Sequence, residues 1–351
     1  FNLTINILDP DPNAPCKNIA NEFTVGKLTD FDTVLKFGQD QDIITIEIEN
    51  VNTAALKELA RLGKKVYPQP EIIELIQDKR KQKTFYKAHR IPTAEFILTE
   101  NREELKNHLP FLPAVHKLGK EGYDGRGVQI IRKEADITKG FDKPSLLERL
   151  VDFDKELSVI VSRNESGDTK CFPMVELVFH PEANLVEYLF APASVSKAIE
   201  EDAFKLATDV INKLEMVGIL AVEMFLTKDG LLLVNEIAPR THNSGHHTIE
   251  ANITSQFEQH LRAILNLPQG ATDLIIPAAM VNVLGEDGFT GDAKYDGMDE
   301  LMEMEGVHLH LYGKKVTKPF RKMGHITVTG ENPSVLKEKV DTIKRIFKVV
   351  A

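Results

Sequence analysis

The sequence predicts an α/β protein, α+β overall, with two or three domains. Strand and helix patterns alternate near the N-terminus, which is typical of a mostly parallel sheet. Further along, two long apolar runs are joined by a turn signal, as in a β-hairpin. The length of 351 residues allows two or three domains at about 150 residues each.

The composition excludes several functional classes. The net charge of -10 argues against a nucleic-acid-binding protein, which would carry a basic face. The two cysteines, Cys16 and Cys171, form no CxxC pair, which disfavours a disulfide scaffold or a cysteine zinc site and fits a reducing cytosol. The sequence contains no apolar run of about 20 residues and no signal segment, so we expect a cytoplasmic protein without a membrane partner.

Periodicity gives the elements of the first part of the chain in order. Alternating apolar residues predict strands at 3–8 and 43–49, and a helix follows at 54–62. Because the chain opens inside the first strand pattern, we expect the natural start to lie upstream. A helix is expected from 71 to 89, after the boundary Pro68-Gln69-Pro70.

The rest of the chain alternates strands with three helices. The first helix, at 202–216, has a continuous apolar face, and the second begins in the capping-box spacing of Ser255 and Glu258 and runs to 265. The third helix lies near 335–347. Strands are predicted at 95–98, 114–117, 128–131, 157–161, 278–284, 308–311 and 325–328.

The strongest chemical signal is the hairpin formed by residues 218–226 and 231–238. If Asp229 and Gly230 form a two-residue loop, Glu223 lies directly opposite Glu236. Like charges in that position are destabilising, and unpaired charges in an apolar run are costly. A bound Mg²⁺ would resolve both problems; alternatively, one glutamate is exposed or meets a local lysine. Asn235 would point away from this site unless the strand bulges.

A glycine-rich segment, residues 122–127, lies between two predicted strands. Its glycines would let backbone N–H groups approach phosphate oxygens, and Arg126 could add a charge-assisted bond. A tight hairpin would give the same pattern. Lys117 ends the preceding strand, from where it could reach a phosphate or simply be solvated.

Three further segments are candidates for binding. Residues 148–156 suggest a connector that could hold adenine and ribose, although acidic linkers are common. Residues 240–247 gather cation, imidazole and amide donors, which favours oxyanion and substrate binding over a plain polar loop or a transition-metal site. Arg321 and Lys322 could converge on a phosphate monoester if residues 319–324 form an irregular loop; such a pair is more often solvated.

These residues together resemble the 5-(carboxyamino)imidazole ribonucleotide synthases, ATP-grasp enzymes of bacterial and fungal purine synthesis. Residues 235–246, which read Asn-Glu-Ile-Ala-Pro-Arg-Thr-His-Asn-Ser-Gly-His, carry the most specific part of the resemblance. The glycine-rich segment, Glu47 with Glu49 and Asn50, residues 255–263 and residues 321–325 occur in the family's order. The resemblance covers essentially the whole chain.

The resemblance implies an ATP-grasp fold in three domains. These are an N-terminal α/β domain (1–77) that lacks the family's first strand and Gly-rich turn, an ATP-grasp domain (78–267) with a lid near 86–148, and a small β-rich C-terminal domain (268–351). It implies that ATP phosphorylates bicarbonate to carboxyphosphate, which the amine of 5-aminoimidazole ribonucleotide captures. It also implies two Mg²⁺ ions, replaceable by Mn²⁺, and a cytosolic homodimer.

The resemblance also assigns roles to individual residues. The metal ligands are Glu223 and Glu236. The reacting groups meet Tyr123, Asp124, Arg126, Arg240, His242 and Asn243. ATP binds at Lys79, Lys117, Gly122, Tyr123, Asp124, Gly125, Arg126, Gly127, Glu148, Val151, Glu156, Asn235 and Glu236. The substrate contacts Glu47, Arg240, His242, Asn243, Ser244, Arg321 and Lys322.

The sequence departs from the family at three positions. Thr241 replaces a Pro or Val, Glu121 replaces a common Gly, and Phe179 stands where an ATP-contacting histidine is expected, with His180 out of register. Three alternatives stay open: another ATP-grasp carboxylate–amine ligase, such as a formate-using glycinamide ribonucleotide enzyme or a biotin carboxylase; a non-catalytic nucleotide-binding regulator; and a zinc protein that uses the histidine loop.

Overall fold

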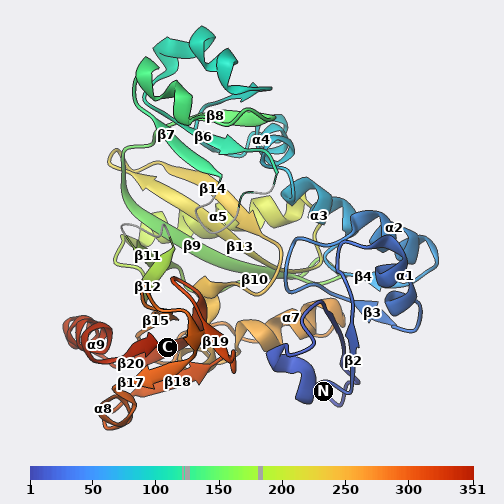
Figure 1. Cartoon of the computed structure of the whole chain (residues 1–351), viewed down its shortest axis with the longest axis vertical. Coiled ribbons are helices and arrows are strands. Elements are labelled where there is room, and N and C mark those ends of the chain that lie inside the picture. The colour runs from blue at the N-terminus through green and yellow to red at the C-terminus, as the bar shows by residue number, and fades with distance from the viewer. Residues whose placement is uncertain (121, 123–126, 181–184) are drawn as a thin grey trace.

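The structure, a computed structural model, describes residues 1–120, 122, 127–180 and 185–351. Figure 1 shows a small teal-to-green sheet at the top, a long central sheet below it, a blue N-terminal part on the lower right and a red C-terminal part on the lower left. This mixed α/β arrangement agrees with the predicted fold class. No helix of the described ranges is long and apolar enough to cross a membrane.

The N-terminal part consists of short parallel strand pairs covered by helices. β1 (Asn6–Asp9) pairs with β2 (Glu22–Val25), and β3 (Ile43–Ile44) pairs with β4 (Lys65–Val66). The 3₁₀ segment η1 (Pro15–Asn18) and helices α1 (Phe31–Gln39) and α2 (Thr53–Arg61) connect them.

The predicted strand 43–49 is wrong in length, because β3 ends at Ile44. Its partner β4 ends at Val66; the Tyr67 N–H makes a last bond to the Ile44 carbonyl, and the chain then begins α3 at Pro70. Glu47 and Glu49 therefore lie in a bend beyond the carboxyl end of β3. That position leaves both carboxylates able to reach other parts of the chain.

The predicted helix 71–89 is two helices, α3 (Pro70–Ile76) and α4 (Lys79–Ala88). The break lies at Asp78, whose backbone is extended and whose side chain accepts a hydrogen bond from the Arg80 N–H at 3.0 Å. This N-cap starts α4 afresh. As a result Lys79 and Lys83, one turn apart, lie on the same face of α4.

The upper sheet has the order β5-β8-β6-β7. Its strands are β5 (Phe96–Thr99), β6 (Ala114–Leu118), β7 (Val128–Ile131) and β8 (Ser145–Arg149). The 3₁₀ segments η2 (Arg102–Phe111) and η3 (Glu134–Lys139) contribute apolar side chains to its small core. We refer to this body as the lid sheet.

The central sheet has the order β14-β13-β9-β11-β12-β15-β20-β18, with β10 added beside β9. It runs without interruption from the middle of the chain into the C-terminal part, because β12 pairs with β15. Its strands are β9 (Phe153–Arg163), β10 (Thr169–Cys171), β11 (Val175–Phe179), β12 (Val186–Ala191), β13 (Gly218–Thr227), β14 (Leu232–Ala238), β15 (Ala278–Leu284), β18 (Val307–Leu311) and β20 (Lys322–Thr329).

Helices cover this sheet and form its largest core. α5 (Lys197–Lys213) starts earlier than the predicted helix 202–216, because Ser196 caps its N-terminus. It packs on β9, β10 and β14, and its buried residues belong to the largest core. The segments η4 (Asn243–Gly245), α6 (Thr248–Ala251) and α7 (Gln256–Ile264) follow β14.

The C-terminal part packs helix α9 (Pro333–Ile346) against β15 and β20. Leu336, Val340 and Ile343 are the helix residues that are at most 2% exposed in this second core. The remaining elements are β16 (Gly291–Asp292), β17 (Lys294–Asp296), α8 (Met298–Met302), β19 (Val316–Thr317) and β21 (Lys348–Val350).

The predicted capping of α7 gives a test of the fold. The Ser255 hydroxyl accepts from the Glu258 N–H, so Ser255→Ala should lower the free energy of unfolding by about 1 kcal/mol. Ser255→Asp, which retains an acceptor, should stay close to the wild type. Denaturant unfolding of the three proteins checks this, and an equal loss in both variants would contradict the cap.

Candidate functional site

Glu223 and Glu236 face each other on the β13–β14 hairpin, as the sequence predicts. The predicted two-residue loop is nevertheless wrong, because the Thr227 N–H donates to the Leu231 carbonyl and leaves three residues between them. The ladder next to the loop is therefore one residue out of the expected register. A β-bulge between Glu223 and Met224 shifts it back and restores the pair.

The bulge also changes the place of Asn235. It is the extra residue between Val234 and Glu236, which are both paired with β13. In a regular strand its side chain would point away from that of Glu236. Here its Oδ1 accepts a hydrogen bond from Lys117 Nζ at 3.2 Å, so Asn235 joins the site.

The two opposed carboxylates have different surroundings. Lys79 Nζ donates to Oε2 of Glu236 at 2.8 Å and lowers the pKa of that carboxyl. Burial, and then the charge of Glu236, raise the pKa of Glu223. The Glu236 side chain keeps 48% of its exposure and that of Glu223 only 14%. An ion or a phosphate group can therefore reach the pair on the side of Glu236.

Lys117 connects the lid sheet with the central sheet. Its Nζ donates to Oε1 of Glu148 on β8 at 2.8 Å, in addition to Asn235 on β14. The Glu148 side chain is 3% exposed, and its Oε2 lies 2.6 Å from Lys83 Nζ. Burial opposes the charge of Glu148, but Lys117 and Lys83 outweigh it and lower its pKa. Lys79 and Lys117 thus lie on either side of the glutamate pair.

Lys83 is a further residue of this site, and it is not among the residues predicted from the sequence. Its spacing from Lys79 on one helix was a usable signal, but the four basic residues among 79–83 gave no indication of which of them is buried. Lys83 is 2% exposed.

Other predicted nucleotide residues lie around Lys117. Glu156 lies on β9, and burial raises the pKa of its carboxyl to about 7, with Lys117 opposing. Such a carboxyl can both accept and donate hydrogen bonds to hydroxyl groups. Val151 follows β8, and Gly122 and Gly127 flank the glycine-rich segment. Gly127 has φ +78°, a conformation that favours glycine. The other predicted lid residues, Tyr123, Asp124, Gly125 and Arg126, lie outside the described residues.

Arg240 ties the loop after β14 to the N-terminal part. Its Nε donates to Oε1 of Glu49 at 2.8 Å, and Nη1 donates to the Thr241 carbonyl at 3.0 Å. For Glu47, displacement of water by the surrounding protein raises the pKa, and Arg240 opposes that shift. The structure thus brings the predicted substrate residues Glu47 and Arg240 together.

The remaining loop residues form a neutral, buried group. Burial and then the charge of Arg240 lower the pKa of His242 to about 3. Its Nδ1 lies 2.9 Å from Ser244 Oγ, and its Nε2 lies 3.5 Å from Oε1 of Glu223. The Oδ1 of Asn243 is buried and has no hydrogen-bond partner among the described residues. These groups can bind a polar ligand without adding a charge.

The two cations near the C-terminus act in different places. The charge of Lys322, at the start of β20, lowers the pKa of both Glu223 and His242. Arg321 instead donates from Nη1 to the Val316 carbonyl at 2.6 Å. The charge of Lys322 therefore acts on Glu223 and His242, whereas Arg321 is held by a backbone carbonyl in this structure.

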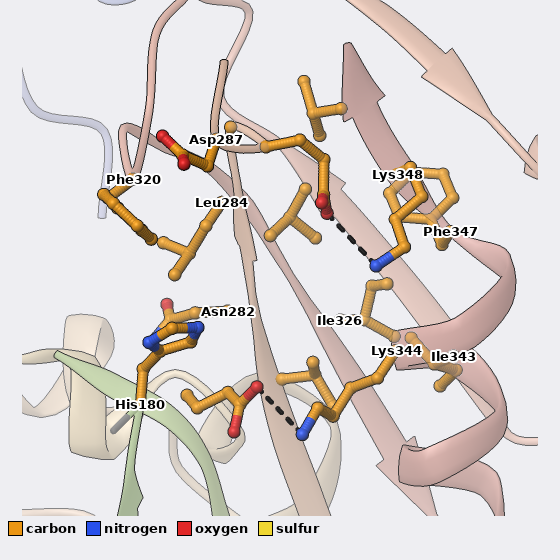
Figure 2. A pocket seen from close by; sticks show the side chains of 16 residues that line it. His180, Asn282, Leu284, Asp287, Phe320, Ile326, Ile343, Lys344, Phe347 and Lys348 are labelled. Atoms are coloured by element: carbon orange, nitrogen blue, oxygen red, sulfur yellow. Dashed lines mark ion pairs between the residues drawn. The ribbon is translucent and has the colours of Figure 1, made fainter. Parts of the chain in front are cut away.

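A cavity of about 220 Å³ lies elsewhere, between β12, β15 and α9 (Figure 2). Lys344 lies 2.8 Å from Glu187 and Lys348 lies 3.2 Å from Glu286, so both cations are already neutralised by carboxylates. His180 lines this cavity. We therefore do not assign the cavity to nucleotide phosphates.

The donor set favours magnesium over zinc. Within residues 1–120, 122, 127–180 and 185–351, no group of three or more His, Cys, Asp or Glu side chains could hold a metal ion. Glu223 and Glu236 supply two carboxylates, and Mg²⁺ commonly completes its shell with water and substrate phosphate. Burial lowers the pKa of His246 to about 3, and its ring packs on that of His325 at 4.6 Å. His246 therefore has a packing role, and the zinc alternative gains no support.

Comparison with known families agrees with this geometry. The chain matches the Ribonucleotide synthetase preATP-grasp domain over residues 1–77, the ATP-grasp domain over 84–257, and the Phosphoribosylaminoimidazole carboxylase C-terminal domain over 278–339. It is 39% identical to the N5-carboxyaminoimidazole ribonucleotide synthase of Bacillus subtilis, over 92% of this chain and 84% of that protein. It is 35% identical, over 96% of its residues, to the chloroplastic phosphoribosylaminoimidazole carboxylase of Vigna aconitifolia, of which it spans 62%.

Solved structures are similar over nearly the whole chain. The N5-carboxyaminoimidazole ribonucleotide synthetase of Thermotoga maritima has a TM-score of 0.91 and 43% identity, covering 99% of this chain and 92% of that one. The synthase of Aspergillus clavatus in complex with ADP and 5-aminoimidazole ribonucleotide has a TM-score of 0.88 and 32% identity, covering 98% and 93%. The chain belongs to the N5-carboxyaminoimidazole ribonucleotide synthase family of ATP-grasp enzymes.

Proposed function

We propose that this chain uses ATP and bicarbonate to carboxylate 5-aminoimidazole ribonucleotide in purine biosynthesis. The products are 5-(carboxyamino)imidazole ribonucleotide, ADP and phosphate. The observation that carries the proposal is the opposed pair Glu223 and Glu236 between Lys79 and Lys117, which suits the phosphates of a nucleotide. Family membership supports the ribonucleotide as the amine substrate.

The first step transfers the γ-phosphoryl group. A bicarbonate oxygen forms a bond to the γ-phosphorus as the bond to ADP breaks, which gives carboxyphosphate. Lys79 and Lys117 would neutralise the phosphates, and Arg240 would orient bicarbonate. Glu148, Val151 and Glu156 would hold adenosine, and the glycine-rich segment of residues 122–127 would complete the nucleotide contacts. Phosphoryl transfer depends mainly on such positioning and charge neutralisation.

The second step forms the carbon–nitrogen bond. The amine of the ribonucleotide would bond to the carboxyl carbon as the bond to phosphate breaks, and the amine proton would pass to the departing phosphate. His242 is neutral, so its imidazole can accept or donate a hydrogen bond at the reacting groups. Asn243, Ser244 and Glu47 would complete the amine site, and Lys322 would meet the ribonucleotide phosphate. Arg321 would join it there only after leaving the Val316 carbonyl.

Two Mg²⁺ ions, with Mn²⁺ as a substitute, are part of the proposal. Glu223 and Glu236 would hold them, with Asn235 beside them, and the ions would supply positive charge to the β- and γ-phosphates. The surroundings of Glu223 support this fit, because burial and the charge of Glu236 outweigh Lys79 and Lys322 and raise its pKa, so a bound cation would stabilise the carboxylate.

A cytosolic homodimer completes the proposal. Ile253 is 58% exposed and Ile275 is 66% exposed, and both flank the bridge between Asn252 and Leu274. Exposed apolar residues of this kind are often covered by a second subunit. Sedimentation of the purified protein tests the assembly, and a concentration-independent monomer would contradict it.

The acid and the amine can be tested in one assay. ADP release should require both 5-aminoimidazole ribonucleotide and bicarbonate. A formate-using ligase would respond to formate instead, and a regulator without catalysis would bind ATP and release no ADP. Release that is indifferent to bicarbonate would overturn the proposal.

Glu236→Gln removes one metal-binding charge and the partner of Lys79 while preserving side-chain size. We expect a folded protein whose kcat falls by at least about 100-fold, because phosphate neutralisation is weakened. Steady-state ADP release and circular dichroism check this, with the exposed Glu338→Gln as control. Near-normal turnover at ordinary Mg²⁺ would contradict the metal assignment.

Lys322→Ala should raise the KM for the ribonucleotide about 10- to 150-fold, since a charge-assisted contact is worth about 1.5–3 kcal/mol. The KM for ATP should barely change. The variant should also discriminate less between the ribonucleotide and its dephosphorylated nucleoside. The exposed Lys318→Ala is the matched control, and an effect confined to ATP would place Lys322 at the nucleotide instead.

A further inference from the structure

Lys83 is a buried cation that touches none of the ligands proposed above. It is 2% exposed and lies on α4, one turn after Lys79. Its Nζ lies 2.6 Å from Oε2 of Glu148 and also donates to the Thr93 hydroxyl. A side chain so deeply covered can affect a ligand only through its neighbours.

The neighbours of Lys83 belong to separate parts of the fold. Glu148 lies on β8 of the lid sheet. Thr93 lies between α4 and β5, and its hydroxyl donates to the Val234 carbonyl on β14 at 2.6 Å. Val234 immediately precedes the bulged residue Asn235. Lys83 therefore joins α4, the lid sheet and the bulged strand at one point.

The two oxygens of Glu148 are divided between two lysines. Oε1 accepts a hydrogen bond from Lys117 at 2.8 Å, and Oε2 forms an ion pair with Lys83. Without Lys83, both oxygens would be open to the Lys117 ammonium, which could then turn away from Asn235. Occupying Oε2 thus fixes the direction of the Lys117 ammonium.

We propose that Lys83 is a positioning residue for nucleotide binding, which holds the Glu148 carboxylate so that Lys117 is directed at the nucleotide phosphates. The inference rests on the proposed function only in taking the ligand to be a nucleotide. Lys83 itself makes no contact with that ligand.

The charge of Lys83 is sensitive to pH. Burial lowers its pKa to about 8, with Glu148 opposing and Lys117 and Lys79 adding to the effect. The ring of Tyr86 lies 5.7 Å from Nζ, and burial raises the pKa of that phenol well above its usual value, so the ring stays neutral. The charge of Lys83 is present below about pH 8 and is lost as the pH rises through it.

This loss is distinguishable from unfolding. A lysine in the unfolded chain keeps its proton until about pH 10.4, so between these pH values the unfolded state binds more protons. The contribution of Lys83 to the free energy of unfolding therefore rises with pH over this range. The positioning of Lys117 is lost over the same range. A fall in nucleotide affinity over this range is a binding effect.

The direct test is calorimetric titration of the full-length chain with MgADP. Lys83→Met keeps the aliphatic stem and removes the charge, and it should raise the Kd for MgADP about 10- to 100-fold. The KM for the ribonucleotide should stay within about twofold. The matched control is Lys81→Met on the same helix, whose side chain is 50% exposed and pairs with Glu74 at 2.7 Å; its Kd should be unchanged.

The pH profile separates positioning from a merely structural role. At constant bicarbonate ion concentration, kcat/KM for ATP reports ionisation of the free enzyme. Lys83→Arg keeps its charge to higher pH. At pH 7 it should bind MgADP about as tightly as the wild type, unlike Lys83→Met. Its kcat/KM for ATP should fall only at a higher pH than that of the wild type. A fall at the same pH as in the wild type would overturn the inference.

The outcomes distinguish this inference from the proposed function. A wild-type protein that binds no MgADP would contradict the proposed function. A wild-type protein that binds MgADP while Lys83→Met binds equally well would overturn the role of Lys83. If Lys83→Met does not fold, Thr93→Val removes only the neighbouring hydroxyl and should weaken MgADP binding about 2- to 10-fold; unchanged binding would again overturn the role.

Discussion

The placement of Glu223 and Glu236 directly opposite each other constrains the rest of this site. Two carboxylates on facing strands repel each other, and one lysine, Lys79, neutralises only one of them. Burial and the charge of Glu236 raise the pKa of Glu223, while Glu236 remains accessible, so a cation can reach the pair. In the proposed function, bound Mg²⁺ would offset the repulsion between the two carboxylates.

A second pair of charges, Lys117 and Glu148, connects this site to the lid sheet. Lys117 bonds to Glu148 in its own sheet and to Asn235 on the bulged strand. The lid sheet and the central sheet are therefore joined by polar contacts at the point where phosphates would bind, rather than by an apolar core. Such a junction can open to admit a nucleotide and close to exclude water from carboxyphosphate.

Much of the fold could be predicted because local signals and tertiary structure agree. Strands such as β7 and β15 and the cap of α7 at Ser255 have the expected bounds. The length of β3 could not be predicted, since it depends on how many residues β4 offers for pairing. The start of α4 was hidden because helix-forming residues continue on both sides of Asp78.

The candidate site, too, could be predicted only in part from the sequence. The glutamate pair was predicted from a two-residue loop, and it exists because a three-residue loop and a bulge offset each other. Periodicity cannot reveal either feature, so the participation of Asn235 stayed conditional. Lys83 could not be predicted because contacts with Thr93 and Glu148 decide which lysine of α4 is buried. Glu148 is far from Lys83 in the sequence, and Thr93 belongs to no recognisable motif.

The most direct test of the account is to locate the metal ion. Crystals of the full-length chain grown with Mn²⁺ and ADP should show anomalous scattering between Glu223 and Glu236, with the Lys117 ammonium near the ADP phosphates. Manganese bound at the histidine loop, or nucleotide density away from Lys79 and Lys117, would contradict it.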